Sequence, residues 1–211
     1  MRIARKRRST SARSSTALPA GTARVSSSKR SRTSNRVLEA SPRDLADVYA
    51  ELGDKAAATA AHVTRLKLLK DDAAKATTPK QAQVHDYARL NSLLALGRGD
   101  DAVALFQQRV WELPGEYEPW ARLASTFFKL DRCPLAAPVV QQAIALSYGT
   151  RRLRYRLLAA DIAHKLNDVA GERAALQALV QEAATLPPAL ADAALAQVAS
   201  ARLDGLAASG P

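Results

Sequence analysis

Small and large apolar residues recur along this chain of 211 residues at an interval of 34. One copy begins near Glu118, where Trp120, Leu123, Ala124 and Phe127 fall at helical spacing on one face. The positions 34 residues earlier carry Leu90 for Ala124, Leu93 for Phe127, Leu96 for Leu130, Ala102 for Ala136 and Phe106 for Val140. Self-similarity at a fixed period of this size indicates a stack of equivalent structural units.

Two weaker copies extend the pattern in both directions. A further step of 44 residues backward gives Ala46, Tyr49, Leu52, Gly53 (against Gly97) and Ala58. The ten extra residues of that step fall at the break Thr77-Thr78-Pro79. A step of 35 residues forward gives Tyr155 for Trp120, Leu158 for Leu123, Ala159 for Ala124 and Ile162 for Phe127. We therefore expect four units.

Helix-forming residues fill the segments between short turn sequences. Alanine, leucine, glutamine and arginine dominate, and Val, Ile and Thr are comparatively sparse. Ser41 and Pro42 suit the cap and first position of a helix at the start of the ordered region. The pattern predicts helices over residues 55–74, 80–96, 102–112, 118–130, 151–166 and 189–206, with others ending near 146 and 186. No segment indicates a strand, so the predicted fold class is all-α.

The best copy resembles the tetratricopeptide repeat, a helix-turn-helix unit of 34 residues. The residues that carry the resemblance are Trp120-x-x-Leu123-Ala124-x-x-Phe127 in the first helix, with Ala136, Val140 and Ala143 in the second. The resemblance covers about residues 39–186, with the best unit at 117–149, partial units at 39–72 and 83–114, and a degenerate fourth. It implies antiparallel helical hairpins stacked as a short solenoid, whose open end the helix at 189–206 would cover.

Several residues depart from the repeat pattern. Asp86 and Arg89 stand where the family has large apolar residues, and Arg109 stands where it has a small one. In the fourth copy Gly171 falls near the small-residue position, and the register slips by one. A general stack of α-helical hairpins outside this family remains the alternative interpretation.

The resemblance also implies a function, because in this family the first helices of the units line a concave groove that binds a peptide or a partner protein. Carried over position by position, the groove residues are Arg43, Asp47, Tyr87, Asn91, Glu118, Ser125, Phe128, Lys129, Arg156 and His164. Phe128 either anchors a ligand in the groove or packs on a neighbouring helix, and the sequence favours neither. The repeated Lys and Asn arrangement that clamps a peptide carboxylate in some family members is missing.

The chain's densest basic cluster outside the tail runs from Arg151 to Arg156, with arginines also at 152 and 154. Such a cluster is more often a solvated helix face than a binding site. As a binding site it would favour acidic peptides or phosphate groups.

Residues 1–36 have a different composition from the rest of the chain. They contain eleven Lys or Arg, thirteen Ser or Thr and no acidic residue, whereas residues 37–211 hold 20 residues of each charge. This segment cannot bury enough apolar surface to offset its ordering entropy, so we expect a disordered basic tail attached to a helical domain at 37–211. The candidate contacts to phosphate or nucleic acid are Arg5, Lys6, Arg7, Arg8, Lys29, Arg30 and Arg32.

The sequence contains no recognisable catalytic motif. His62, His85 and His164 are scattered without ligands at metal-binding spacing, and Gly97-x-Gly99 joins two helices rather than holding a phosphate. We therefore expect a non-catalytic scaffold without cofactor or metal. The alternative is a nucleic-acid-associated protein that binds non-specifically through the tail.

No run approaches the roughly 20 apolar residues that span a bilayer, and the single cysteine, Cys133, cannot form an internal disulfide. The expected location is the cytoplasm, or an organelle if the tail acts as a transit peptide. The sequence leaves the oligomeric state open.

Overall fold

The computed structural model describes residues 40–188 and 190–208. The secondary structure of this part is entirely helical, with no strand, which confirms the predicted fold class. The tail at 1–36, its expected disorder and its candidate phosphate contacts lie outside the described residues. None of the described helices is long and apolar enough to cross a membrane.

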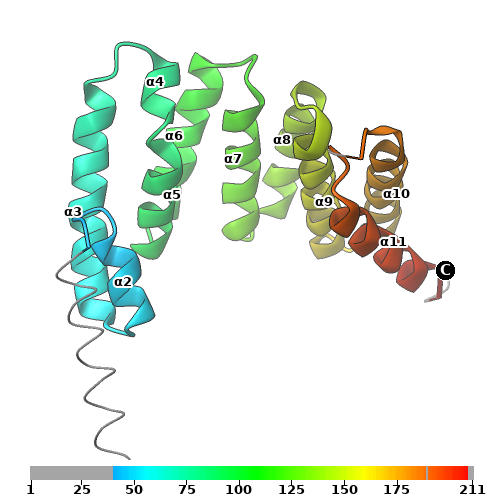
Figure 1. Ribbon diagram of the computed structural model, residues 1–211, viewed down its shortest axis with the longest axis horizontal. Coiled ribbons are helices and arrows are strands. Elements are labelled where there is room, and N and C mark those ends of the chain that lie inside the picture. Colours follow the sequence, from blue (N-terminus) through cyan, green and yellow to red (C-terminus); the bar gives the residue numbers. More distant parts are fainter. Residues whose placement is uncertain (1–39, 189, 209–211) are drawn as a thin grey trace, which may run out of the picture.

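The helices follow one another in a single row, each packed mainly against its neighbours in the chain (Figure 1). They are α2 (Leu45–Glu51), α3 (Lys55–Ala74), α4 (Pro79–Gln83), α5 (Asp86–Ala95), α6 (Gly99–Glu112), α7 (Tyr117–Lys129), α8 (Cys133–Leu146), α9 (Gly149–Lys165), α10 (Val169–Thr185) and α11 (Ala193–Ala208).

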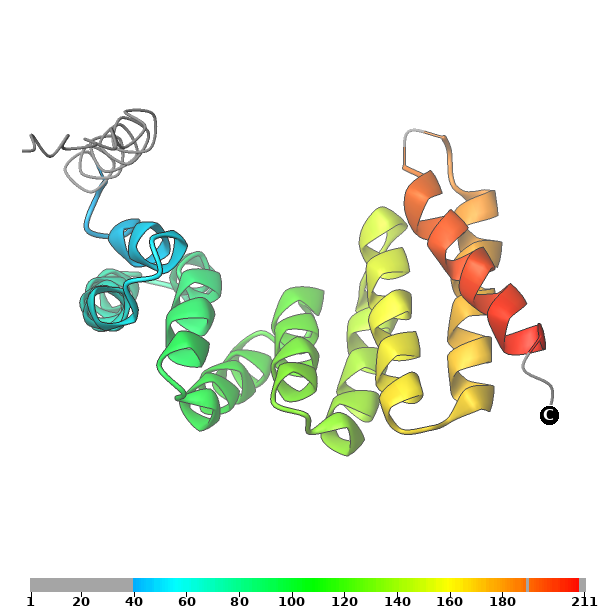
Figure 2. The ribbon, with the colours of Figure 1, turned by 90° about the horizontal axis from the view of Figure 1, so that it is seen from below.

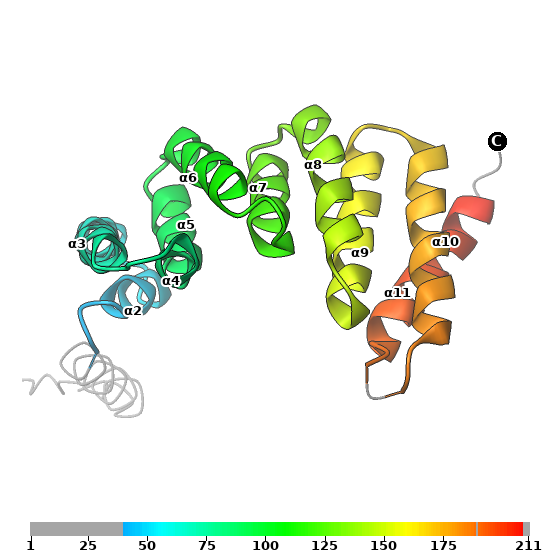
Figure 3. The same cartoon turned by 90° about the horizontal axis from the view of Figure 1, so that it is seen from above.

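The row is bent, as views from below and above show (Figures 2 and 3). Helices α6 and α8 lie on one side of the row, and α5, α7 and α9 lie on the other. The two ends, α2 and α11, turn toward the side of α5, α7 and α9. The first helices of the hairpins therefore line the concave side.

Four hairpins share one turn geometry. Gly53, Gly97, Asp131 and Asn167 each follow the first helix and adopt a positive φ, between 57° and 75°. The residue after each of them donates its backbone N–H to a carbonyl five positions earlier, as Arg98 does to Leu93 at 2.8 Å. This is the hydrogen bond that closes a helix with a left-handed residue. The same turn geometry therefore closes the first helix of all four hairpins.

The core follows the predicted alternation of small and large residues. Ala102, Ala124 and Ala136 are fully buried where helices approach closely, and Phe106 and Phe127 fill the space between them. This core cluster runs from Leu66 on α3 to Ile162 on α9 and includes the single cysteine, Cys133. The stability of such a core depends on close packing of complementary side-chain volumes rather than on any single contact.

Helix α9 buries two of its faces. Ala159 and Ile162 belong to the central core, and Leu153 and Ala160 belong to a second cluster formed with α10 and α11. Helix α11 lies across the end of the row and buries Ala199 completely in this second cluster. The expected cover at the C-terminal end is thus present, although the helix begins at Ala193 rather than 189.

The structure corrects two local expectations. The single helix expected over 80–96 is wrong, because the chain turns at Val84-His85 and divides it into α4 and α5. Ser41 was expected to cap the first helix, but its hydroxyl donates instead to Asp44 at 2.6 Å and α2 begins at Leu45.

The three charged departures from the repeat pattern form one buried network. Arg109 on α6 donates from Nε to Asp86 on α5 at 2.5 Å, and Asp86 also accepts from Arg89 at 3.0 Å. Asp86 is fully buried, and Arg109 also pairs with Glu112. Burial alone would lower the pKa of Arg109, but the bonds to Asp86 and Glu112 outweigh that effect and raise it. Each of these charged residues departs from the repeat pattern, but in the folded protein their charges pair with one another.

Candidate functional site

The concave side carries a pocket that crosses three successive first helices. It has a volume of about 190 Å³ and opens to solvent between α5, α7 and α9. The lining residues are Tyr87, Leu90, Glu118, Ala121, Arg122, Ser125, Lys129 and Tyr155. We call this pocket the groove.

Helix α7 supplies most of the groove because of its amphipathic spacing. Glu118, Arg122, Ser125 and Lys129 recur every three or four residues, which places them on one face. Phe127 on the opposite face is buried in the core. The packing that fixes α7 therefore also fixes the orientation of its groove face.

Charges within the groove are unevenly paired. Arg122 donates to Glu118 at 2.7 Å, and Glu118 also accepts from Gln83 at 3.2 Å. The guanidinium of Arg122 lies 4.9 Å from the ring centre of Tyr87. Lys129 is exposed and has no ion-pair partner among the described residues. The groove therefore presents one uncompensated positive charge.

Tyrosine rings continue from the groove toward the first turns of α7 and α9. The ring of Tyr155, in the groove, lies 6.0 Å from that of Tyr117, and Tyr117 lies 6.4 Å from Tyr148. Arg151 stacks on Tyr117 at 5.4 Å. Burial raises the pKa of both Tyr117 and Tyr155 above the ordinary value.

The structure brings four of the ten predicted groove residues together. Tyr87, Glu118, Ser125 and Lys129 line the groove, and Asn91 lies half-buried one turn beyond Tyr87 on α5. Phe128 packs against the central core, with the Lys165 amine 4.7 Å from its ring centre. Of the two predictions for Phe128, the structure shows packing on neighbouring helices.

The other four predicted residues contact helices of their own hairpins. Their partners are Asp72 for Arg43, Arg65 for Asp47, Glu182 for Arg156 and Glu172 for His164. None of these four lines the groove. Two arginines of the α9 cluster are also paired, since Arg152 and Arg156 both form ion pairs with Glu182. These arginines stabilise the last hairpin rather than offering a free cationic surface.

Four further lining residues were not predicted from the sequence: Leu90, Ala121, Arg122 and Tyr155. Leu90 and Tyr155 were assigned to the core through their register, and both do contribute to it while showing one edge to the groove. Arg122 carried a usable signal, because it follows Glu118 by four residues, the spacing of a helical ion pair.

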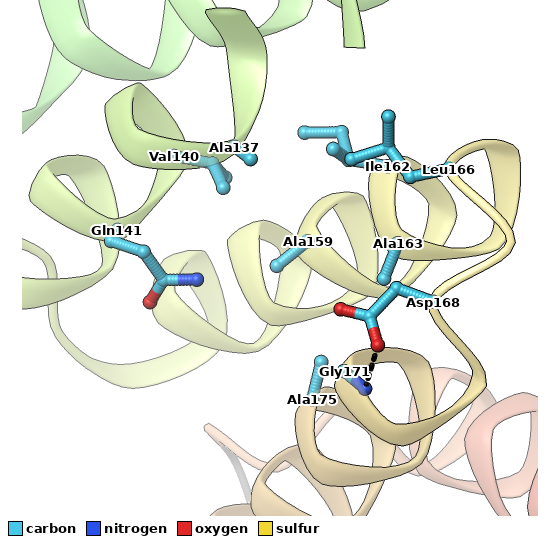
Figure 4. A pocket seen from close by; sticks show the side chains of 10 residues that line it. All are labelled: Ala137, Val140, Gln141, Ala159, Ile162, Ala163, Leu166, Asp168, Gly171 and Ala175. Carbon is cyan, nitrogen blue, oxygen red and sulfur yellow. Dashed lines mark hydrogen bonds between the residues drawn. The ribbon is translucent and has the colours of Figure 1, made fainter. Parts of the chain in front are cut away.

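A second cavity lies between α8, α9 and α10 (Figure 4). It has a volume of about 120 Å³, and its walls are mostly small apolar side chains such as Ala137, Ala159 and Ala175. Of its two polar residues, Asp168 accepts from the backbone of Gly171 at 2.9 Å and caps α10. The cavity therefore has few polar groups that could bind a ligand specifically.

The three histidines belong to different elements, with His62 on α3, His85 just before α5 and His164 on α9. His62 is buried, with Nδ1 3.4 Å from the Ser92 hydroxyl, and its burial lowers its pKa. His164 contacts Glu172 at 2.8 Å. Among the described residues, no three His, Cys, Asp or Glu side chains converge as they would around a metal ion.

The chain matches no family model, and no curated protein matches it either.

Proposed function

We propose that this protein is a non-catalytic scaffold that binds a segment of a partner protein in the groove between α5, α7 and α9. The observation that carries the proposal is the shared lining of one open pocket by three successive first helices. An open surface that crosses three helices suits an extended peptide better than a compact small molecule. The proposal includes the tetratricopeptide-like character of the stack, supported by the recurring residue pattern and turn geometry.

The groove has the composition expected of a recognition surface. Tyr87 is 54% exposed although it is a large aromatic residue, and Leu90 and Ala121 form an apolar floor beneath the polar rim. Aromatic and arginine side chains dominate the binding energy of protein interfaces. Lys129 adds a charge that can select among partners.

Site-specific photo-crosslinking tests the proposal. A photoreactive phenylalanine analogue replaces Ser125 in the groove or, as the matched control, the exposed Gln142 on α8. In host lysate we expect a protein adduct of defined mass from position 125 and none from position 142. Adding Lys129→Glu to the position-125 protein should remove that adduct, because it reverses the unpaired groove charge.

Equal adducts at both positions, or adducts only to nucleic acid, would contradict the scaffold proposal. Adducts only to nucleic acid would favour the alternative in which the basic residues at 1–36 supply the binding.

A further inference from the structure

An open cleft lies between α3, α5 and α6, where α5 packs against both of the other helices (Figure 3). It consists of two adjoining pockets, with volumes of about 210 and 280 Å³, that share Lys70 and Arg98 as lining residues. We call the two pockets together the basic cleft. None of its lining residues lines the groove.

Basic residues outnumber acidic ones in the walls of the basic cleft. The charged lining residues are Lys67, Lys70, Arg89, Arg98, Asp71 and Asp101. Each carboxylate already has a cation beside it, since Asp101 pairs with Arg98 at 2.6 Å and Asp71 with Lys67 at 3.7 Å. The charges of Lys70 and Arg89 therefore have no acidic counterpart within the cleft.

Arg89 is only partly neutralised by the residues behind it. Its Nη1 donates to Asp86 at 3.0 Å, but Asp86 also accepts from Arg109. Its Nε is buried without a hydrogen-bond partner, and no described residue accepts from Nη2. Buried polar groups are nearly always hydrogen-bonded, and this side chain is only 14% exposed. The guanidinium therefore retains donor capacity next to the cleft.

Lys70 and Arg98 stand where the two pockets join. Lys70 is exposed and makes no hydrogen bond or ion pair to any described residue. Arg98 is the N-cap residue of α6, the end of the helix at which the dipole favours negative charge. Leu93 and Leu105 line the same pocket and are buried. Their low polarity strengthens the attraction between these cations and an anion.

A phosphate group suits the basic cleft better than a carboxylate does. At neutral pH a phosphate monoester carries nearly two negative charges and three acceptor oxygens, whereas a carboxylate carries one charge on two oxygens. Guanidinium groups match the geometry of phosphate, and lysine binds it as a point charge. Each pocket is smaller than the roughly 300 Å³ at which pockets for drug-sized molecules begin, so a single small group fits better than a large cofactor.

We propose that the basic cleft binds a phosphate monoester group, with Lys70, Arg89 and Arg98 as its cationic contacts. Inorganic phosphate and a phosphorylated serine side chain share this chemistry, and separate probes distinguish them. The proposal is independent of partner binding in the groove, because the cleft and the groove have no lining residue in common.

Titration of the isotope-labelled full chain, followed by NMR, tests the proposal because amide shifts locate the bound group. The probes are inorganic phosphate and N-acetyl-O-phosphoserine amide, and the control probes are the amides of N-acetylserine and N-acetylglutamate. With either phosphate probe we expect saturable shifts of the Lys70, Gly99 and Asp101 amides. We expect none with the serine control and binding about tenfold weaker with the glutamate control.

Two substitutions in the cleft test its residues. Lys70→Gln and Arg98→Gln should each raise the Kd of phosphoserine about tenfold. The matched control is Lys55→Gln, which removes another exposed lysine of α3 that has no ion-pair partner among the described residues, and it should leave the Kd unchanged. A further control replaces Arg5, Lys6, Arg7 and Arg8 with glutamine and should also leave it unchanged.

The outcomes separate the sources of phosphate from the failure of the proposal. Tighter binding of phosphoserine than of inorganic phosphate assigns the cleft to a phosphorylated side chain, and binding of inorganic phosphate at least as tight assigns it to the free ion. Three results would overturn the proposal: no saturable shift in the cleft, equal binding of the glutamate control, or an effect of Lys55→Gln as large as that of Lys70→Gln. Loss of the shifts in the variant with four glutamines would assign phosphate to residues 1–36 and overturn it as well.

Discussion

At the residue scale, the buried ion pair between Asp86 on α5 and Arg109 on α6 should be the most sensitive to substitution. Asp86 has no exposed surface, and Arg109 bonds to it through Nε at 2.5 Å. A charge that loses its partner in such a place keeps its desolvation penalty without its compensation. The pair therefore tolerates joint replacement better than the removal of one member.

Asp86→Ala should lower the free energy of unfolding by about 3 kcal/mol, because it leaves Arg109 buried without its main partner. The double variant Asp86→Leu with Arg109→Met should recover most of that loss, since two apolar side chains of similar volume fill the site. Denaturant unfolding followed by circular dichroism measures both. Asp101→Ala breaks the exposed pair with Arg98 and should change stability by less than about 1 kcal/mol. A double variant less stable than Asp86→Ala would contradict this account.

The same residues show where prediction from sequence stops. The inward positions Ala124, Phe127, Ala136 and Val140 were predicted correctly, because helical spacing fixes which side chains share a face. Asp86 and Arg109 looked like two independent defects, since nothing local connects residues 23 positions apart. Their compensation depends on how α5 and α6 pack, which periodicity does not specify.

At the scale of the elements, the hairpin turns repeat more faithfully than the helices they join. A left-handed residue closes the first helix of every hairpin, but glycine occupies this position only at 53 and 97. Asp131 and Asn167 adopt the same conformation through their tolerance of positive φ. Glycine at 53 and 97 is therefore favoured because it adopts a positive φ without strain, and not because a side chain would clash there.

Gly97→Ala should destabilise the protein by about 1 kcal/mol, because an alanine at φ +68° is strained although its Cβ would meet no atom within 4 Å. Gly115→Ala is the matched control, since that site is equally open and its φ is not positive. Thermal unfolding of the two variants gives the comparison. Equal midpoints would show that the left-handed turn contributes nothing.

Arg202 adds an ion-pair anchor to the apolar packing that holds α11 on the stack. Arg202 bonds to Asp161 on α9 and to Glu172 on α10, each at 2.5 Å. Burial raises the pKa of Glu172, but its hydrogen bonds from Arg202 and His164 outweigh burial and lower the pKa below its ordinary value of 4.5. The folded state then binds fewer protons than the unfolded state near this pH, so α11 is stabilised above pH 4.5 and loses stability as the pH falls below it.

Hydrogen exchange in α11 tests this anchor. Arg202→Met should lower the protection factor of Ala199 roughly tenfold at neutral pH, and protection in the wild-type protein should fall as the pH drops below 4.5. Arg154→Met, which removes only a loose and exposed contact to Asp192, should have little effect. Unchanged protection in Arg202→Met would mean that apolar packing alone holds α11.

Element boundaries were the least predictable feature of the fold. The expected bounds of α3 agree with the structure, because Asp54 caps it with a bond to the Ala57 N–H. The break between α4 and α5 was missed, since Val84-His85 carries neither glycine nor proline. There the tertiary bond of Asp86 fixes the start of α5, and no local residue preference marks it.

On the scale of the whole molecule, the described residues form two core clusters that meet at α9 and at Ala175 on α10. Leu93 belongs to the central cluster, and Leu179 belongs to the cluster under α11. Helices stacked in a line share stability mainly with their neighbours. A destabilising substitution at one end of the row should therefore lower the stability of the other end only partly.

Leu179→Ala should destabilise the C-terminal hairpin by about 3 kcal/mol and raise hydrogen exchange in α10 and α11, with little change in α3 and α5. Leu93→Ala removes an equally buried side chain from the central cluster and should give the opposite distribution. Mass spectrometry of peptides after exchange measures both variants. Uniform loss of protection in either variant would indicate a single cooperative unit.

The groove was predicted in part. Its position on the first helices and four of its residues followed from the repeat register, because that register places the same face of each unit side by side. Arg43, Asp47, Arg156 and His164 shared the register but face partners within their hairpins, since charged side chains turn toward the nearest opposite charge. The repeat register predicts which residues share a helix face. Ion pairs within each hairpin then determine which of these side chains are left unpaired to contact a ligand.

The central claim is that the folded groove, rather than the basic residues at 1–36, captures the partner. Affinity capture from host lysate with nuclease compares the wild-type full chain, a groove variant (Tyr87→Ala with Lys129→Glu) and a tail variant (Arg5, Lys6, Arg7 and Arg8 all →Gln). The account predicts a defined protein that survives nuclease and binds the wild-type and tail variant but not the groove variant. Material that nuclease removes, and that the tail variant alone fails to bind, would contradict it.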